Sequence, residues 1–202
     1  MDKKICLWSS PRNISTALMY SFASRSDTKV FDEPLYAYYL KFSGLDHPAR
    51  DIILENYEQD ADKVIKQIIL KQHAPITFHK LMTHFLQGID KSFLKKVKNI
   101  LLIRDPVAII SSYNKIIPNP NINDIGIQMQ VDLYEELNAC DHIDAIIDAD
   151  ELLMNPKSVL KQLCNKLDIS FQASMLKWKK GGRIEDGVWA KHWYSALHQS
   201  SG

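Results

Sequence analysis

Short apolar runs alternate with longer amphipathic segments along the chain, and this alternation constrains the fold more than any other feature. The apolar runs span residues 4–9, 29–34, 75–81, 99–106 and 144–152. Their length and composition are typical of buried strands. Strands that alternate with helices predict an α/β domain with a parallel sheet. We therefore expect a three-layer sandwich in which helices cover both faces of a central sheet of about five strands.

The segments between these runs carry helical signals. Pro106 stands where a missing N–H costs nothing, at the first turn of a helix, and Asn155 is a predicted N-cap with Pro156 just inside. Residues 117–124, IPNPNIND, are the most loop-like internal segment. Helices are expected over residues 14–24, 60–72, 107–116, 124–140 and 156–167.

The size of the chain favours a single domain over residues 1–202. Hydrophobic residues make up 46% and charged residues 24%, which is ordinary for a globular protein. The formal net charge of +1 provides no global field for nucleic acid or a membrane surface. An anion site must therefore be built locally.

The cysteines and the N-terminus indicate a reduced, cytoplasmic protein. Cys6, Cys140 and Cys164 are far apart, and no CxxC pair or His/Cys cluster suggests a metal. Neither a signal peptide nor a membrane span is recognisable in the sequence.

The turn after the first apolar run places a cation where a helix begins. Residues 6–22 read CLWSSPRNISTALMYSF, so Arg12 precedes the helix and Ser15 and Thr16 stand in its first turn. The first turn of a helix has unpaired N–H groups and a partial positive charge, which favour an anion. The ATP-binding pattern GxxxxGK[ST] is absent, since no glycine precedes Gly44. An ordinary helix cap beside a surface arginine is the alternative interpretation.

A second cation follows the fourth apolar run. Arg104 begins the stretch RDPVAIISSY, and Ser112 lies in the helix that follows. Ligands of open parallel sheets bind at the carboxyl ends of the strands, so Arg104 should border the same crevice as Arg12. A surface ion pair between Arg104 and Asp105 is the alternative.

These segments resemble motifs of the sulfotransferases that use 3′-phosphoadenosine-5′-phosphosulfate (PAPS). The family has a loop similar to P-K-S-G-T-T, matched here by residues 11–16, whose cation and hydroxyl groups hold the 5′-phosphosulfate. Its R-[ND]-P-x-x-x-x-x-S motif is matched by residues 104–112, and the Arg and Ser of that motif hold the 3′-phosphate. The resemblance thus implies donor contacts from Arg12, Asn13, Ile14, Ser15, Thr16, Arg104 and Ser112.

Two C-terminal segments extend the resemblance. Residues 179–193, KKGGRIEDGVWAKHW, are similar to the family's R-K-G…G-x-W-K-x-H segment, and residues 148–169 are similar to a structural signature of the family. The match covers residues 4–194 and implies a P-loop NTPase-like sulfotransferase fold. It also implies phosphate contacts from Lys180, Gly181, Gly182 and Arg183.

The loop departs from the family pattern at two positions. Arg12 replaces a lysine, and arginine can hold an oxyanion but does not give up its proton. Ile14 replaces a glycine, and its branched side chain makes a positive φ costly.

The family's catalytic K-T-H stretch is imperfectly matched by FHKLMTHFL. Lys80 matches the lysine, whereas Thr83 and His84 are shifted by two residues. We expect His84 to be the general base, because an unperturbed imidazole titrates near ~6.5. His79 is a reserve candidate.

Glu33 is a close rival for the role of base. It ends the second apolar run, where several branches of the family carry a similar E-P pair, although Asp32 and Glu33 could equally cap the next helix. Several aromatic residues either line a ligand pocket or pack a core: Tyr36, Tyr38 and Tyr39 on the acceptor side, and Trp178 and Trp189 against the adenine.

Taken together, these features predict transfer of a sulfuryl group from PAPS to a hydroxyl of a small-molecule or sugar acceptor. Arg12, Glu33, Lys80 and His84 are the expected catalytic residues, and no metal is needed because the donor arrives complete. Two alternatives remain: a P-loop nucleotide kinase or hydrolase, and a catalytically inactive nucleotide-binding protein. The sequence indicates neither the acceptor nor the oligomeric state.

Overall fold

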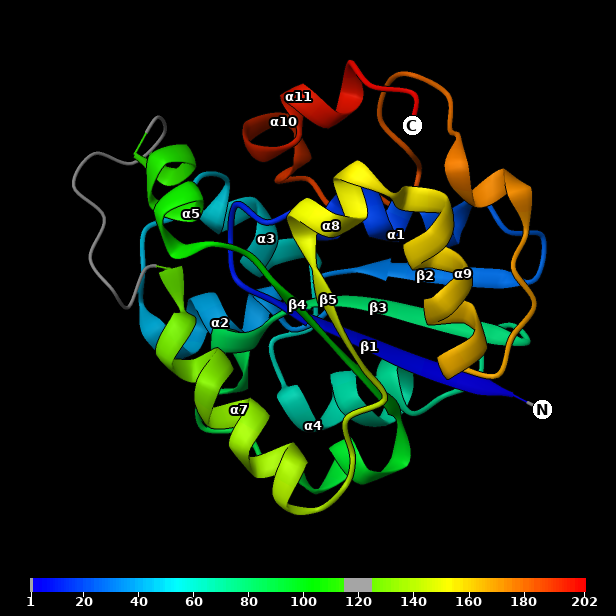
Figure 1. Ribbon diagram of the computed structural model, residues 1–202. Helices are drawn as coiled ribbons and strands as arrows, with labels where there is room; N and C mark the ends of the chain where they lie inside the picture. The colour runs from blue at the N-terminus through cyan, green and yellow to red at the C-terminus, as the bar shows by residue number, and fades with distance from the viewer. Residues whose placement is uncertain (1, 115–124) are drawn as a thin grey trace.

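The computed structural model describes residues 2–114 and 125–202, and its strands form one parallel sheet (Figure 1). The strands are β1 (Lys3–Ser9), β2 (Thr28–Asp32), β3 (Ile76–Met82), β4 (Lys98–Ile103) and β5 (Ala145–Asp148). Their order across the sheet is β2-β3-β1-β4-β5. The predicted α/β class with about five parallel strands is confirmed.

The central strand β1 pairs with β3 on one side and with β4 on the other. Ser9, its last residue, lies opposite Met82 of β3 and Leu102 of β4. Because all the paired strands are parallel, the turns that follow them open at the same edge of the sheet.

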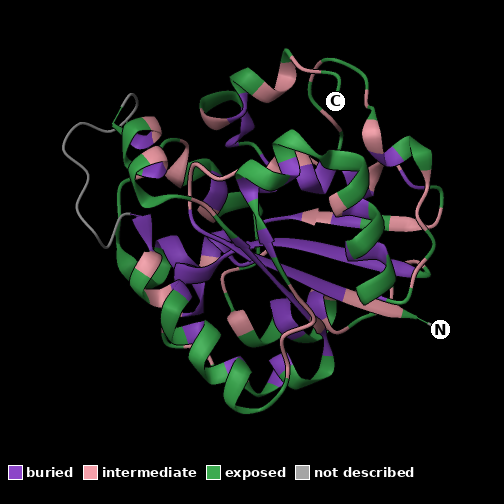
Figure 2. Ribbon diagram, in the orientation of Figure 1, coloured by how far each residue is buried: buried purple, intermediate pink, exposed green. Residues whose placement is uncertain are grey.

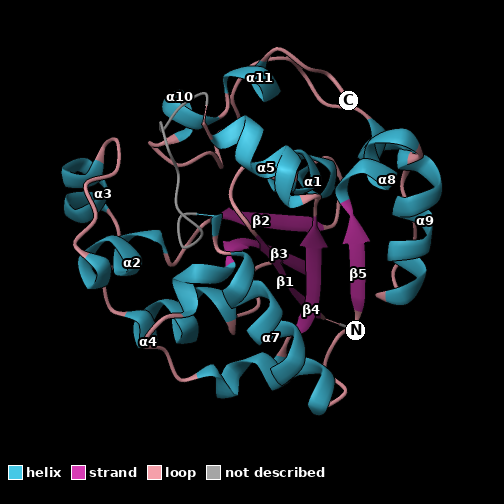
Figure 3. Cartoon of the chain, turned by 60° about the vertical axis from the view of Figure 1, so that its left-hand side comes forward, coloured by secondary structure: helices cyan, strands magenta, loops and turns pink. Residues whose placement is uncertain are grey.

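Helices cover both faces of the sheet, as Figure 3 shows. Alternate residues of β1 face the two layers: Ile5 and Leu7 join one apolar cluster, and Cys6 and Trp8 join the other. The first cluster includes residues of α1 (Ser15–Ala23), α8 (Ala149–Met154) and α9 (Pro156–Lys166). The second includes residues of α2 (Tyr36–Ser43), α3 (Arg50–Asn56), α4 (Ala61–Val64) and α7 (Ile127–Ala139). The central strands β1, β3 and β4 are therefore the most buried part of the sheet (Figure 2).

Shorter elements complete the chain. Four single-turn elements are η1 (Ile65–Ile69), η2 (Thr83–Leu86), η3 (Lys91–Lys96) and η4 (Ala173–Leu176). Helix α5 (Pro106–Tyr113) follows β4, and α10 (Ala190–Trp193) and α11 (Ser195–His198) lie near the C-terminus. Within residues 2–114 and 125–202, no helix is both long enough and apolar enough to cross a bilayer.

The structure differs from the predicted elements in three places. The fifth strand ends at Asp148, because its carboxylate accepts hydrogen bonds from the N–H groups of Asp150 and Glu151 and so begins α8. The helix expected over 60–72 is split into α4 and the π-helical turn η1, which ends at Ile69. Asn155 precedes α9, but its side chain donates to Glu151 rather than capping α9. The predicted loop over 117–124 lies outside the described residues.

Candidate active site

Asn13 holds the loop that joins β1 to α1. Its Nδ2 donates to the carbonyl oxygen of Leu102 in β4 at 3.0 Å, and its Oδ1 accepts from the N–H of Ile14 at 2.9 Å. The positive φ of the loop occurs at Arg12 (58°), whereas Ile14 has a φ of −86°. The branched side chain of Ile14 is thus accommodated without the backbone strain expected from the sequence. No side chain caps α1, which leaves its first N–H groups free for a ligand.

Arg12 and Arg104 meet beside this helix end. Arg104 Nη1 donates to the carbonyl oxygen of Arg12 at 2.9 Å, and Arg12 Nε donates to Ser112 Oγ at 3.2 Å. Arg12 also contacts the carbonyl oxygen of Trp193 through Nη1 at 3.5 Å. Arg12 and Arg104 both line the cavity that is described below, as predicted from the strand ends that they follow.

The charges of this pair are only partly balanced by the protein. Burial, and then the neighbouring charge of Arg104, lower the pKa of Arg12. Among residues 2–114 and 125–202, buried Arg104 Nε has no hydrogen-bond partner, and an Asp150 carboxylate oxygen lies 3.8 Å away. An unpaired buried donor next to a second cation fits a bound phosphate or sulfate group.

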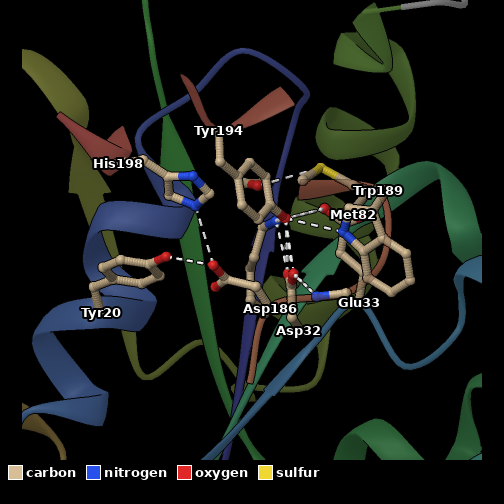
Figure 4. A network of polar contacts seen from close by, with 11 residues as sticks. Tyr20, Asp32, Glu33, Met82, Asp186, Trp189, Tyr194 and His198 are labelled. Carbon is tan, nitrogen blue, oxygen red and sulfur yellow. Dashed lines mark hydrogen bonds and ion pairs between the residues drawn. The ribbon is translucent and has the colours of Figure 1, made fainter. Parts of the chain in front are cut away.

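A buried lysine forms the second part of the site, and Figure 4 labels its partners Asp32, Glu33 and Tyr194. Lys80 Nζ donates to Asp32 Oδ1 at 3.0 Å, to Glu33 Oε1 at 2.5 Å and to Tyr194 Oη at 2.6 Å. An ammonium group has three hydrogens, so each has an acceptor. Lys80 itself is 0% exposed, which makes these partners necessary for keeping its charge.

The environment makes Glu33 a stronger base than an exposed glutamate. Burial raises the pKa of its carboxyl group. The positive charge of Lys80 opposes this shift but does not reverse it. Burial alone would lower the pKa of Lys80, but the charges of Asp32 and Glu33 raise it. We therefore describe the cluster as an ammonium group held between two carboxylates.

Asp32 and Glu33 are not helix caps, contrary to the alternative drawn from the sequence. Helix α2 begins at Tyr36 with Leu35 as its N-cap residue, and no side chain caps it. Asp32 instead accepts from the Tyr194 hydroxyl at 2.9 Å and from the backbone N–H of Gly187 at 3.1 Å.

The structure separates the two candidate histidines. His84 lines the cavity, packs edge-on against Tyr39 and Phe85, and has its pKa lowered by burial to about 3. A base so weak is largely neutral at every physiological pH. His79 lies outside the cavity, and its ring nitrogens contact the carbonyl oxygens of Ile5 and Ile68. Its position outside the cavity disfavours the role of reserve base.

The glycine-containing segment lies away from these groups. The guanidinium of Arg183 contacts Glu185 Oε2 at 3.2 Å and the carbonyl oxygen of Ala23 at 3.1 Å, and it lies over the Tyr20 ring. None of the four residues expected to contact phosphate here lines the cavity: Lys180, Gly181, Gly182 and Arg183. Their contacts with a donor remain a prediction.

A cavity of about 580 Å³ connects the two parts of the site. It is bordered by the loop and first turn of α1, by Arg104 and Ser112, and by Glu33, Lys80 and His84. Apolar side chains cover further wall: Leu152, Leu160, Met175, Leu176 and Leu197. Buried polar atoms of three other lining residues have no hydrogen-bond partner in the described structure: Ser21, Trp178 and Ser200. A volume and lining of this kind suit a small organic ligand with polar substituents.

The aromatic residues divide between cavity and core. Tyr36, Tyr39 and Trp178 line the cavity, whereas the hydroxyl of Tyr38 donates to the carbonyl oxygen of Gln87 at 2.7 Å outside it. Trp189 is buried away from the cavity, and its indole N–H donates to Tyr194 Oη at 3.1 Å. The core interpretation is therefore correct for Trp189.

Sequence reasoning missed the role of Tyr194. This residue follows α10, more than a hundred positions from its partner Lys80, and stands in an aromatic stretch without a recognisable motif. The same C-terminal region is tied to α1 by Asp186, whose Oδ2 accepts from the Tyr20 hydroxyl at 2.6 Å and contacts His198 Nε2 at 3.1 Å (Figure 4). The sequence drew attention to residues 180–183 of this region, whereas the structure brings Tyr194 to the charged cluster.

Two plant proteins are similar to the chain in sequence. They are branched-chain-amino-acid aminotransferase-like proteins 1 and 2 of Arabidopsis thaliana, which are 43% identical over 199 residues and 44% identical over 198 residues. Each alignment covers 96% of this chain but 35% of the relative. The chain thus spans about a third of the length of these relatives, and their names describe much longer proteins.

Several solved structures with a similar fold are sulfotransferases. One is a sulfotransferase domain from the curacin biosynthetic pathway, with a TM-score of 0.55 and 19% identity over 93% of this chain and 81% of that chain. Another is a sulfotransferase from Alicyclobacillus acidocaldarius, with a TM-score of 0.54 and 11% identity over 84% of this chain and 82% of that chain. At such identities the likeness supports the predicted P-loop NTPase-like fold and carries no statement about substrates.

A family model described as "Sulfotransferase domain" matches residues 3–202. The matched range covers nearly the whole chain. The chain belongs to the sulfotransferase domain family.

Proposed function

We propose that the protein transfers the sulfuryl group of PAPS to a hydroxyl group of a small-molecule or sugar acceptor. The observation that carries the proposal is the meeting of Arg12 and Arg104 at the uncapped start of α1, in the same cavity as Glu33 and Lys80. Sulfuryl transfer needs an anion site that faces a base, because catalysis depends on positioning and on charge compensation.

On this proposal the residues around α1 bind the donor. Arg12 and the N–H groups of residues 14–16 hold the 5′-phosphosulfate, while Arg104 and Ser112 hold the 3′-phosphate. The unpaired indole N–H of Trp178 and the apolar wall of the cavity receive the adenine. Residues 180–183 reach a phosphate only if their segment moves from its present position outside the cavity.

Glu33 is the proposed general base. It removes the proton of the acceptor hydroxyl while the acceptor oxygen forms a bond to sulfur and the bond from sulfur to the 5′-phosphate oxygen breaks. The products are the sulfated acceptor and 3′-phosphoadenosine-5′-phosphate (PAP). Glu33 takes precedence over His84, because burial raises the pKa of the carboxyl group and lowers that of the imidazole to about 3. His84 then serves as a neutral hydrogen-bonding group in the wall of the acceptor site.

Calorimetric titration with PAP tests the proposal without knowledge of the acceptor. PAP should bind the wild-type protein and raise its melting temperature, and Arg104→Ala should weaken this binding by roughly 10- to 100-fold. Absence of both heat and a melting shift at millimolar PAP would refute the proposal.

The same samples discriminate the alternatives. A P-loop kinase or hydrolase would bind ATP with Mg²⁺ at the loop and hydrolyse it after metal is restored to a chelator-treated sample. The missing GK[ST] signature disfavours this function. An inactive nucleotide-binding protein would bind PAP yet transfer no sulfate from PAPS to any member of a broad panel of hydroxyl compounds.

A further inference from the structure

The hydroxyl of Tyr194 forms hydrogen bonds with the charged cluster of Asp32, Glu33 and Lys80 beside the cavity. Its oxygen accepts from Lys80 Nζ at 2.6 Å and from Trp189 Nε1 at 3.1 Å, and its hydrogen points to the carboxylate of Asp32 at 2.9 Å. Tyr194 is buried. It follows α10, far along the chain from β2 and β3, whose residues Asp32 and Lys80 its hydroxyl joins.

This arrangement leaves one atom of the cluster available for chemistry. Lys80 directs its three hydrogens to Asp32, Glu33 and Tyr194, so none remains for a substrate oxygen. Glu33 uses Oε1 for Lys80, whereas its Oε2 makes no hydrogen bond to any residue in 2–114 or 125–202. Because Glu33 lines the cavity, Oε2 is the atom that can accept a proton there.

We propose that Tyr194 is a positioning residue, whose hydroxyl takes the third hydrogen of Lys80 and thereby keeps the ammonium group on Glu33. The inference rests on the proposed function, in which Glu33 is the base. Lys80 acts through Glu33, because none of its three hydrogens is left for a substrate oxygen.

The backbone supports the same geometry. Glu33 has a φ of 47°, which is rare for a residue with a side chain and is found where a structure holds a group in place. Its N–H donates to the carbonyl oxygen of Lys80 at 2.9 Å, so the two residues are joined by main chain as well as by side chains. The position of Glu33 is thus determined by β3, and that of the ammonium by Tyr194.

Loss of the Tyr194 hydroxyl has a defined electrostatic consequence. The groups that act on Glu33 are Asp32 beside it, Lys80 on β3 and Tyr194, and Tyr36 of α2 lies close enough to respond to its charge. Without the hydroxyl, Asp32 loses a donor and attracts the ammonium more strongly, so Lys80 shifts away from Glu33. A carboxylate that loses a nearby cation binds its proton more tightly.

Carbon-13 NMR of the glutamate carboxyl groups measures this effect in the unliganded protein. The Glu33 signal is assigned from its absence in Glu33→Gln. In Tyr194→Phe we expect the midpoint of its titration to rise by about one pH unit, the size associated with withdrawal of an opposite charge. Trp189→Phe, which removes the donor to Tyr194 together with part of a buried ring, should give a smaller shift in the same direction, and it carries the test if Tyr194→Phe does not fold.

Tyr57→Phe is the matched control. The Tyr57 ring lies 5.3 Å from that of Trp189 and its hydroxyl is 3.4 Å from the N–H of Val188, so it touches the same segment without reaching Lys80. This variant should leave the Glu33 midpoint unchanged. Equal midpoints in wild type and folded Tyr194→Phe would overturn the positioning role, and so would an equal shift in Tyr57→Phe.

Calorimetry with PAP on the same variants keeps the two proposals apart. PAP affinity should be the same in Tyr194→Phe as in the wild type. If PAP does not bind the wild type but the Glu33 midpoint shifts as expected, the proposed donor is wrong and the placement of the ammonium by Tyr194 stands. If PAP binds and the midpoint does not move, the positioning role alone is wrong.

Discussion

Arg104 donates a hydrogen bond through Nη1 to the backbone carbonyl oxygen of Arg12, 2.9 Å away. This contact joins the turn after β4 to the turn after β1, so cations from two separate segments form one wall of the cavity. Like charges that are partly buried together are stabilised by a bound anion, because the anion replaces the lost hydration. The contact therefore links the geometry of the loop to donor binding.

Arg104 should be the strongest single determinant of donor affinity. Arg104→Ala removes charge-assisted hydrogen bonds worth about 1.5–3 kcal/mol, which corresponds to roughly a 10- to 100-fold weaker PAP affinity. Arg104→Lys should recover only part of this loss, because a lysine cannot contact Arg12 and a phosphate with the same fork of donors. Arg50→Ala, on α3 outside the cavity, is the calorimetric control and should bind PAP normally.

The positive φ of Arg12 predicts a difference between two variants that both lack the guanidinium. Arg12→Gly and Arg12→Ala should each lose most of their PAP affinity. The glycine variant should unfold with a free energy about 1 kcal/mol higher than the alanine variant, because glycine adopts a φ of 58° without strain. Urea denaturation measures the difference, and equal stabilities would contradict the predicted strain at this position.

Replacement of Lys80 should destabilise the fold as well as the site. Lys80→Met leaves two buried carboxylates without their cation, which costs about 3–5 kcal/mol in the free energy of unfolding at neutral pH. The loss should shrink as the pH falls, because protonation removes the unpaired charges, and it should be reduced by a second change, Asp32→Asn. Lys63→Met, in a surface pair with Glu58, should cost no more than about 1 kcal/mol.

Buried His79 predicts acid sensitivity. Its pKa is lowered to about 4 in the folded state from 6.5, chiefly by burial, so the unfolded chain binds more protons between these values. The stability that follows from the neutral ring is complete above pH 6.5 and is lost as the pH falls toward 4. We expect a contribution of about 3 kcal/mol over this interval. Urea denaturation at several pH values measures how the free energy of unfolding depends on pH. This dependence should be shallower for His79→Gln, while exposed His192→Gln should match the wild type.

The cysteines report on the core through their reactivity. Cys6 and Cys164 are 0% exposed, and burial raises the pKa of both thiols, whereas Cys140 is exposed. A thiol reagent should therefore modify one cysteine quickly in the native protein and the other two only after unfolding. Cys140→Ser should abolish the fast phase, and persistence of that phase would show that the core opens readily.

The sequence by itself determined the architecture and predicted that Arg12 and Arg104 border the same cavity. Apolar runs of strand length alternate with helical segments, and a parallel sheet is the solution that buries both faces of such strands. Arg12 and Arg104 both follow strands, so the rule that parallel strands end at one edge placed them together before any contact was known. These features depend on local patterns and on topology, which a sequence expresses directly.

Only the tertiary structure distinguished the environments of the candidate bases. In sequence, His84 and Glu33 are close rivals for the role of base because each residue type can accept a proton. Which of them binds a proton more tightly depends on burial and on neighbouring charges. The contact of Tyr194 with Lys80 joins distant parts of the chain, and nothing in the local pattern around either residue encodes it. A proton affinity is the sum of desolvation and of charges brought close by folding, so it is a property of the packed molecule rather than of any stretch of its sequence.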